Sequence, residues 1–564
     1  MFIKQPNILL RSWRRVDVRT DLVAGLTVAA IAIPQSMAYT TLAGVSLSVG
    51  LYTALIAMLV FAFFTSSRRV IVGPDTAMSV MAGAAIAPFA AVNPTAAAVY
   101  VPILAAMVGM ILLVGARLKL HYIAEFLSRP ILLGYLVGVA LVIITDQIPK
   151  TLGLRVGGEN LWLNIIGVIE KFGSVHSPTI LLSILLLALG VFLQKFVPKL
   201  PTAIVLLVLA TVMSAALDFQ SLGIATVGSV PAGLPNLLVP TISVELIQKL
   251  LLPAIAIALV AYADTIATVR SFASKNREQV DTEQELDSLG TTNLAVSLVG
   301  GMPVSASGSR TVVNDGLKAR SQFAQIYGAI AIGLVLIAFA QYLRYIPRAA
   351  LAVIILLSAY KLLDYDELDA IWRGWRSEAI LVVITAIGVS IFGILQGLGA
   401  AVVLAILNLI RRSAFPHDAT LGITEDGATF RDTSRPPKTY DTPGLIIYRF
   451  DAPLFFGNAN YFRDRAMAHI RKSKEPVRWF LLDAEAISSI DSTGAKMLKA
   501  FIGELEELDI IFATARVKGP IRDTLRRTGL GARIENRPRF ASIGKAYEAY
   551  CDRYGLMMRR PKAK

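Results

Sequence analysis

The sequence is poor in charged residues, since Asp, Glu, Lys and Arg make up only 17% of its 564 positions. Soluble globular domains carry about 25%. The shortage is uneven, because charges are sparse between Asp21 and Ile410 and become frequent after Arg411. This distribution excludes a single soluble domain. It indicates a membrane part of nearly 400 residues followed by a soluble part of roughly 130 to 150 residues.

Residues that build metal sites and disulfides are also scarce, with one cysteine, Cys551, and four histidines. The lone cysteine excludes an intrachain disulfide framework and a Cys-rich metal site. The chain has no Gly-x-Ser-x-Gly elbow, no Walker lysine loop and no metal-ligand spacing, so we expect neither an enzyme nor a bound cofactor. We also expect no cleavable signal peptide, because residues 1–20 are polar and rich in arginine.

The net charge of +15 does not indicate nucleic-acid binding. Most basic residues of the membrane part lie in short clusters between apolar runs, such as Arg68 with Arg69 and Arg411 with Arg412. A nucleic-acid surface would show a basic stripe with interleaved aromatic residues, and none is present. Short basic clusters of this kind fix the orientation of a multi-pass membrane protein.

Long apolar runs are abundant, and a helix needs about 20 residues to cross the hydrocarbon core. We predict fourteen spans, of which eleven are clear and three (residues 72–91, 286–300 and 303–317) are short, interrupted or more polar. The clear ones lie near residues 22–43, 50–65, 99–115, 131–146, 179–196, 202–217, 251–270, 322–342, 347–363, 378–395 and 397–411.

Basic clusters give the orientation of these spans. With fourteen spans and the N-terminus inside, all eight clusters fall on the cytoplasmic side, as the positive-inside rule requires. Four basic residues, Lys150 and Arg348 among them, fall on the outer side as exceptions. An even number of spans also leaves the C-terminal soluble part in the cytoplasm.

Two of the interrupted segments begin at glycine–proline breaks. One break is Gly73-Pro74-Asp75 and the other runs from Gly300 to Pro303, and 229 residues separate the two prolines. The first and eighth spans, which begin near Asp21 and Leu251, have almost the same offset. A shared offset predicts two seven-helix halves of common design, and matched broken helices mark the binding site of a transporter. The alternative is a pair of ordinary kinks.

The second break carries the chemistry of an anion site. A half-helix that starts at mid-membrane directs its free N–H groups and positive dipole end toward the bilayer centre. Next to the break stand the hydroxyls of Ser305, Ser307 and Ser309, followed by Arg310. A basic residue at that depth is costly and predicts a functional site. The alternative for Arg310 is a helix-end side chain that extends to the cytoplasmic face.

At this point several motifs resemble those of one family. They are Asp21-Leu22-Val23-Ala24-Gly25-Leu26-Thr27-Val28, Ile33-Pro34-Gln35-Ser36-Met37-Ala38-Tyr39, Gly50-Leu51-Tyr52-Thr53, Val72-Gly73-Pro74, Gln284-Glu285-Leu286, Gly300-Gly301-Met302-Pro303-Val304 and Ser309-Arg310-Thr311. In order and spacing they are similar to the SulP (sulfate permease) family of anion transporters. The resemblance covers essentially the whole chain.

The resemblance implies seven plus seven inverted spans, divided into a core domain and a gate domain. It places the anion site between the starts of the first, third, eighth and tenth spans. Carried over to this sequence, the substrate-binding residues are Gln35, Tyr39, Asp75, Thr76, Ala77, Ser307, Ser309 and Arg310. The alternative for Gln35 and Tyr39 is helix–helix hydrogen bonding just after the Pro34 kink.

Acidic residues bear on coupling. Asp264 lies well inside the eighth span, and the resemblance implies that an acid here is the proton or sodium site. Thr268 lies four residues on, on the same helix face, and offers a further oxygen to a sodium ion. The alternative for Asp264 is a buried acid held neutral or paired with Arg310. An acid such as Asp75 beside an anion site repels substrate unless it is protonated or cation-bound, which favours cation–anion symport over exchange.

The soluble part alternates strand and helix patterns. Residues 444–450, 477–482 and 509–517 predict three buried strands, each followed by a helix. This order resembles a STAS domain, the fold shared with bacterial anti-sigma-factor antagonists, and Ile490-Asp491-Ser492-Thr493-Gly494 is its most specific motif. In those antagonists a serine of this motif is phosphorylated, so Ser492 is either a regulatory phosphorylation site or a helix N-cap.

We therefore expect a cytoplasmic segment 1–20, a transmembrane domain 21–412, a linker 413–436 and a cytoplasmic STAS domain 437–564. The polar, proline-containing stretch 413–443 is interpreted as the linker plus a first irregular strand. The predicted function is secondary active uptake of sulfate with H+ or Na+, by a homodimer in the inner (plasma) membrane. The alternatives are a bicarbonate or dicarboxylate symporter and an exchanger of chloride, bicarbonate or sulfate. A channel is the other reading of the membrane part, and the broken helices with a membrane acid fit alternating access better than a continuous pore.

Overall fold

The computed structural model describes residues 18–93, 96–119, 129–154, 156, 161–197, 200–228, 231–238, 244–427, 429–527 and 537–558. The predicted N-terminal segment 1–20 lies outside the described residues except for its last three. The chain divides into two compact units, residues 1–405 and 406–564. The first is called the membrane unit here and the second the C-terminal unit, and each is described by itself.

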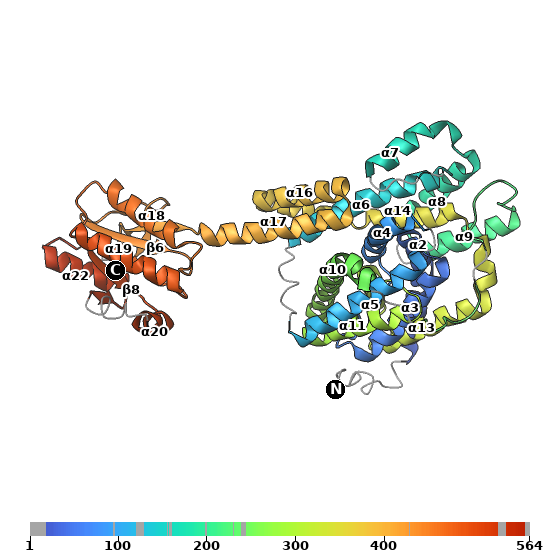
Figure 1. Cartoon of the computed structure of the whole chain (residues 1–564), viewed down its shortest axis with the longest axis horizontal. Coiled ribbons are helices and arrows are strands. Elements are labelled where there is room, and N and C mark those ends of the chain that lie inside the picture. The colour runs from blue at the N-terminus through green and yellow to red at the C-terminus, as the bar shows by residue number, and fades with distance from the viewer. Residues whose placement is uncertain are drawn as a thin grey trace. The chain divides into compact units, whose positions relative to one another are not determined.

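The membrane unit is helical throughout (Figure 1). A helix lies at each predicted span, and seven of the described helices are long and apolar enough to cross a membrane. The first half holds α2 (Val18–Ala43), α3 (Leu47–Phe64), α4 (Thr76–Ala90), α5 (Ala96–Arg117), α6 (Arg129–Thr151), α7 (Leu161–Glu170), α8 (Ser177–Phe196) and α9 (Thr202–Ala216). The second half holds α10 (Val244–Asn276), α11 (Thr282–Ser297), α12 (Gly308–Gly316), α13 (Phe323–Leu334), α14 (Arg348–Tyr360), α15 (Tyr365–Gly374), α16 (Arg376–Phe392) and the first part of α17 (Ile394–Ala414), which continues past residue 405 into the C-terminal unit.

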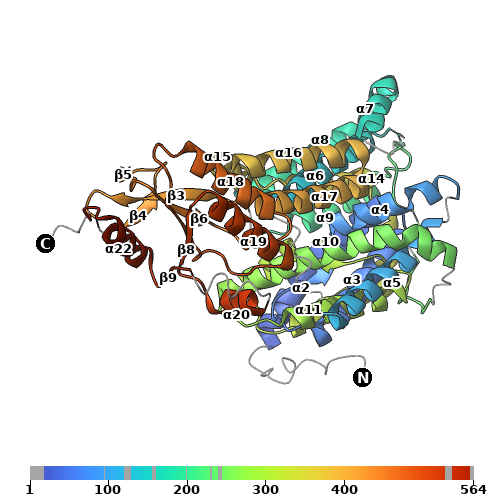
Figure 2. The same cartoon turned by 60° about the vertical axis from the view of Figure 1, so that its left-hand side comes forward.

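Helices of the two halves interleave rather than forming separate bundles. The helix α2 packs against α13, α5 against α11, and α6 against α14 and α16. Glycines permit the closest approaches, since a Cβ on Gly25 would stand 2.3 Å from the Ala324 carbonyl oxygen and one on Gly109 2.7 Å from the Leu294 nitrogen. The helices α2–α5 and α10–α13 thus form one group, and α6, α8, α9, α14 and α16 form another (Figures 1 and 2). These groups match the expected core and gate domains.

The C-terminal unit is an α/β fold around a sheet of order β4-β3-β6-β7-β8-β9, in which β5 also pairs with β3. Neighbouring strands β6 (Leu445–Phe450), β7 (Trp479–Asp483), β8 (Ile511–Ala515) and β9 (Arg539–Phe540) run parallel. The helices α18 (Ala459–Lys472), α19 (Ser492–Glu507) and α20 (Gly519–Arg527) share a hydrophobic cluster on one face, and α22 (Ile543–Tyr554) covers the other. The three predicted strands coincide with β6, β7 and β8.

The sheet begins earlier than predicted. Residues 413–436 were expected to be a linker, and one irregular strand was expected within 413–443. The structure instead forms β3 (Asp418–Thr424) and β4 (Phe430–Asp432) inside 413–436, and β5 (Thr439–Tyr440) follows. Strand β3 pairs antiparallel with β6 and buries Ala419, Leu421 and Ile423. Alternating apolar residues are typical of a strand with one buried face, and the polar residues between them suggested a linker instead. The fold of this unit therefore starts before residue 437.

Candidate functional site

Two broken helices meet inside the membrane unit. The two-residue strands β1 (Val72–Gly73) and β2 (Ser305–Ala306) pair antiparallel, with Val72 opposite Ala306 and Gly73 opposite Ser305. Each strand leads into a helix, α4 after β1 and α12 after β2. The pairing brings the two helix N-termini together, as the matched glycine–proline breaks predicted. Both ends present free N–H groups and a positive dipole end to the same place.

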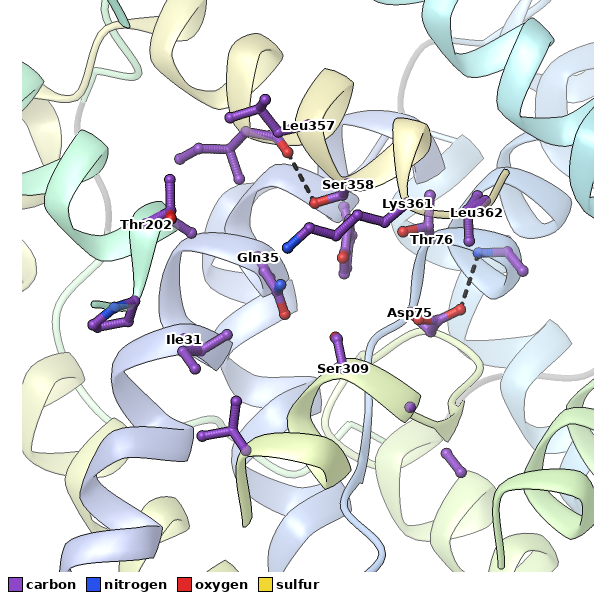
Figure 3. A pocket seen from close by; sticks show the side chains of 18 of the residues that line it. Ile31, Gln35, Asp75, Thr76, Thr202, Ser309, Leu357, Ser358, Lys361 and Leu362 are labelled. Carbon is purple, nitrogen blue, oxygen red and sulfur yellow. Dashed lines mark hydrogen bonds between the residues drawn. The ribbon is translucent and has the colours of Figure 1, made fainter. Parts of the chain in front are cut away.

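A cavity of about 570 Å³ lies at these helix ends (Figure 3). Asp75, Thr76 and Ala77 line it from the start of α4, and Gly308 and Ser309 from the start of α12. The other helices add further polar residues. These are Gln35 and Tyr39 from α2, Asp264 from α10, Gln194 from α8, Thr202 from α9, and Ser358 and Lys361 from α14 and the turn after it. The cavity therefore lies between the predicted core and gate domains.

The cavity contains most of the predicted anion-site residues. Gln35, Tyr39, Asp75, Thr76, Ala77 and Ser309 line it, whereas Ser307 and Arg310 lie behind its wall. Among the described residues, the Gln35 carbonyl oxygen has no hydrogen-bond partner although it is buried. An unsatisfied buried carbonyl oxygen is available to a ligand that donates a hydrogen bond, whereas an anion would need the amide nitrogen of the same side chain.

Arg310 is positioned differently from the expectation. Its side chain is fully buried, and one terminal nitrogen donates to the carbonyl oxygen of Pro74, just before α4. The guanidinium lies against Gly73, where a Cβ would come within 2.9 Å of the other terminal nitrogen. Within the described part of the chain, that nitrogen and Nε have no hydrogen-bond partner. Arg310 therefore binds the first break and is not one of the residues that line the cavity.

Asp264 lines the cavity, and its carboxylate accepts a 3.2 Å hydrogen bond from the Ser305 hydroxyl of β2. The next residue, Thr265, accepts a 3.0 Å bond from the Ala306 backbone. Thr268, the predicted additional oxygen for sodium, is half-buried one turn further along α10 and is not among the cavity residues. The threonine that contacts the break is therefore Thr265.

Lys361 was missed by the sequence analysis. It follows the last residue of α14, and its side chain extends into the cavity toward Gln35 (Figure 3). In the described part of the chain no carboxylate pairs with its ammonium group. A lysine at the end of a predicted span is usually one that reaches for the membrane surface. Only the packing of α14 beside α2 shows that this one points at the anion site.

Comparison with known proteins identifies the family. The model of the sulfate permease family matches residues 18–385, and that of the STAS domain matches residues 436–546. The chain belongs to the sulfate permease family. Its fold class, a multi-pass helical transporter with a STAS domain, is thereby confirmed.

Similar proteins span almost the whole chain. A Mycobacterium tuberculosis protein named "Probable sulfate transporter MT1781" is 38% identical over 549 residues, covering 97% of this chain and 98% of its own. "Sulfate transporter 4.1, chloroplastic" of Arabidopsis thaliana is 29% identical over 530 residues, covering 91% and 77%. The structure of SLC26A9 matches with a TM-score of 0.87 at 18% identity, over 97% of this chain and 93% of that one. The transmembrane domain of the cyanobacterial bicarbonate transporter BicA matches at 0.60 and 24% identity, over 70% and 97%.

In the STAS domain, Ser492 is exposed as the first residue of α19. The helix N-cap is Asp491, whose carboxylate accepts a 2.7 Å bond from the Gly494 backbone nitrogen. The expectation that Ser492 caps the helix was therefore wrong, because the aspartate before it fills that role. Regulatory phosphorylation of Ser492 stays a prediction.

Proposed function

We propose that the chain carries sulfate into the cell by symport with H+ or Na+. The observation that supports this function best is the cavity where the N-termini of α4 and α12 meet beside Asp264. The cavity has a positive electrostatic field, which comes from the two helix N-termini, Lys361 and the nearby guanidinium of Arg310. No ion pair within the cavity cancels this field in the described structure. A dianion gains more from such a field than a monoanion does. The names of the relatives favour the same substrate.

Lys361 gives the gate domain a part in binding. Gln35, Thr76 and Ser309 come from the core domain, whereas Lys361 and Ser358 lie at the end of α14 in the gate domain. Substrate held by donors of both domains would draw them together. The same ammonium group would discriminate between sulfate and a monoanion, because its Coulomb attraction scales with the charge of the substrate.

Asp264 is the proposed coupling residue. A carboxyl inside a membrane span is costly unless a proton or cation neutralises it, and Asp264 receives one hydroxyl donor only in the described structure. Neutralisation of Asp264 removes a repulsive charge from the cavity and so favours anion binding. When the cation leaves Asp264, the repulsive charge returns and weakens anion binding. The cation and the anion are therefore released on the same side of the membrane. This linkage is symport.

The experiment is uptake of radiolabelled sulfate by proteoliposomes that hold the purified full-length protein. Imposed proton and sodium gradients are compared, with bicarbonate and fumarate tested in parallel. We expect accumulation of sulfate driven by one of the two gradients. Sulfate flux that needs another anion on the opposite side and ignores both gradients would show an exchanger, and transport of bicarbonate or fumarate alone would replace sulfate as the substrate.

Assembly and orientation belong to the same proposal. We place the N-terminus and the STAS domain in the cytoplasm of a plasma-membrane homodimer, in accordance with the basic clusters. Removal of residues from Ser413 onward should weaken the dimer, measured by light scattering in detergent, more than it alters the choice of anion. A truncated protein that prefers a different anion would place the STAS domain in the transport pathway.

A further inference from the structure

The two helix ends at the cavity differ in their caps. Asp75 is the N-cap of α4, and its carboxylate accepts a 3.2 Å hydrogen bond from the Ala77 backbone nitrogen. Ser307 is the N-cap of α12, and its hydroxyl caps no backbone N–H of the first turn, although it lies 3.4 Å from the Ser309 hydroxyl. The start of α4 thus already has a carboxylate oxygen on its backbone amide, whereas no side chain caps the backbone at the start of α12; Figure 3 shows Asp75 and Ser309 at these two helix ends.

An ordinary cap does not explain the choice of aspartate at this depth. Asn, Asp and Ser cap helices about equally well, so an uncharged residue would fill the same role. An ionisable residue in a membrane span carries a cost that a neutral cap avoids. Asp281, which caps α11 through the Glu283 and Gln284 nitrogens, is exposed and has no such cost. The carboxylate of Asp75 therefore calls for a function beyond capping.

The charged and titratable groups around Asp75 come from each neighbouring element. Four of them are close enough to interact electrostatically with the Asp75 carboxylate, and Lys361 lines the same cavity. The four are Tyr39 of α2, Tyr135 of α6, Asp264 of α10 and Arg310 of α12. In the described part of the chain no lysine or arginine forms an ion pair with Asp75. In the described structure the carboxylate is held by backbone amides at the start of α4, those of Thr76 and Ala77, and by the nearby charge of Arg310.

We propose that the Asp75 carboxylate is a built-in competing anion, which occupies the α4 half of the site until it takes up a proton as the substrate binds. This inference rests on the proposed transport of an anion through this cavity. The proton converts the carboxylate to a neutral carboxyl and weakens its hold on the Ala77 amide. A substrate oxygen then accepts that N–H bond. On release the proton leaves with the anion and the carboxylate returns, so one proton accompanies each cycle in addition to any cation at Asp264.

The test is sulfate binding to the purified full-length protein by titration calorimetry, in buffers of different ionisation enthalpy so that proton uptake is measured directly. The variants are Asp75→Asn and Asp75→Ser, which keep a capping oxygen without the charge. We expect either variant to bind sulfate at least about tenfold more tightly at neutral pH. Each should take up one proton fewer per sulfate than the wild type. Asp281→Asn makes the same change at an exposed cap and should alter neither quantity.

The outcomes separate the inference from the proposed function. If the wild type and both Asp75 variants bind sulfate with equal affinity and equal proton uptake, Asp75 is only a cap. That result would overturn the inference and leave the proposed sulfate transport standing. Sulfate binding by the variants but not by the wild type at neutral pH would support the inference strongly. Failure of all three to bind sulfate at any pH would overturn both the inference and the choice of sulfate.

Discussion

The two units of the chain differ in the hydrogen-bond and ion-pair partners that surround their buried acids. In the C-terminal unit, Asp483 is fully buried and receives Arg516 through two nitrogens at 2.6 and 2.9 Å. In the membrane unit, Asp264 accepts a bond from one hydroxyl and Asp75 a bond from the Ala77 amide, both at 3.2 Å. The first acid is neutralised by the fold itself. The fold does not neutralise Asp264 and Asp75 in this way, and we propose that a proton or a cation from solution does so.

A fourth acid shows that a membrane carboxyl can also be satisfied without a cation. Glu285 of α11 is fully buried and accepts bonds of 2.6 to 3.1 Å from the hydroxyls of Thr65 and Ser66 and the backbone nitrogens of Ser66 and Ser67. It ties α11 to the segment before β1. Asp264 and Asp75 have far fewer donors and line the cavity. The difference in donor number thus separates an acid that holds the fold from the two acids that we propose to serve transport.

The largest effect is expected from Arg310→Ala, which removes the guanidinium cation that lies near Asp75. The field at both helix ends then loses its strongest source, and the Pro74 carbonyl loses its donor. Sulfate transport and binding should both be abolished while the protein still assembles, measured by uptake and by size-exclusion chromatography. Arg373→Ala, at an exposed arginine paired with Asp369, is the matched control. Undiminished sulfate affinity in Arg310→Ala would exclude the arginine from the site.

The next largest effect is expected from Asp264→Asn, which fixes this position in a permanently neutral state. Accumulation against a gradient should fall, because neutralisation of this position no longer depends on a cation and only the proposed proton at Asp75 is left to drive uptake. Slow equilibrative exchange of sulfate should survive, since the anion donors are intact. Paired measurements of gradient-driven uptake and of exchange in the same proteoliposomes check this. Undiminished accumulation in Asp264→Asn would exclude Asp264 from the coupling and leave it to Asp75 alone.

Sequence alone located this site but not the directions of its side chains. The breaks at Pro74 and Pro303 were readable because glycine–proline pairs recur at one offset, and β1 and β2 pair where they predicted. Ser309 and Arg310 were both assigned to the cavity, yet successive residues of a helix point about 100° apart. Ser309 faces the cavity, so Arg310 faces the wall. Lys361 was not predicted, because its direction depends on how α14 packs against α2.

A smaller effect, on stability rather than transport, is expected from Asp483→Asn in the C-terminal unit. Removal of one partner from this pair leaves Arg516 with Glu485 alone. The cost should be about 3 kcal/mol of unfolding free energy, the lower end of what breaking a buried ion pair costs. Hydrogen exchange of the β7 amides in the full-length protein measures it. Sulfate affinity should stay unchanged, and a loss of affinity would mean that the paired acids also serve transport.

The smallest effect is expected from acid, through Asp418 of β3. Burial raises the pKa of this carboxyl, but hydrogen bonds from His469 and Arg465, together with the charge of Arg465, outweigh burial and lower its pKa to about 2. An aspartate in an unfolded chain has a pKa near 3.9, so the folded state holds this proton less tightly than the unfolded state does. The pairing therefore stabilises the unit fully above about pH 4, and the contribution disappears as the pH falls toward 2. Because Arg465 is partly exposed and water screens the pair, we expect a contribution of about 1 to 2 kcal/mol. Hydrogen exchange of β3 and α18 in the full-length protein, corrected for intrinsic rates, should show this loss between pH 4 and 2 in the wild type and not in Asp418→Asn. An equal loss in both proteins would assign the acid sensitivity to other carboxyls and remove Asp418 from the class of acids that the fold itself neutralises.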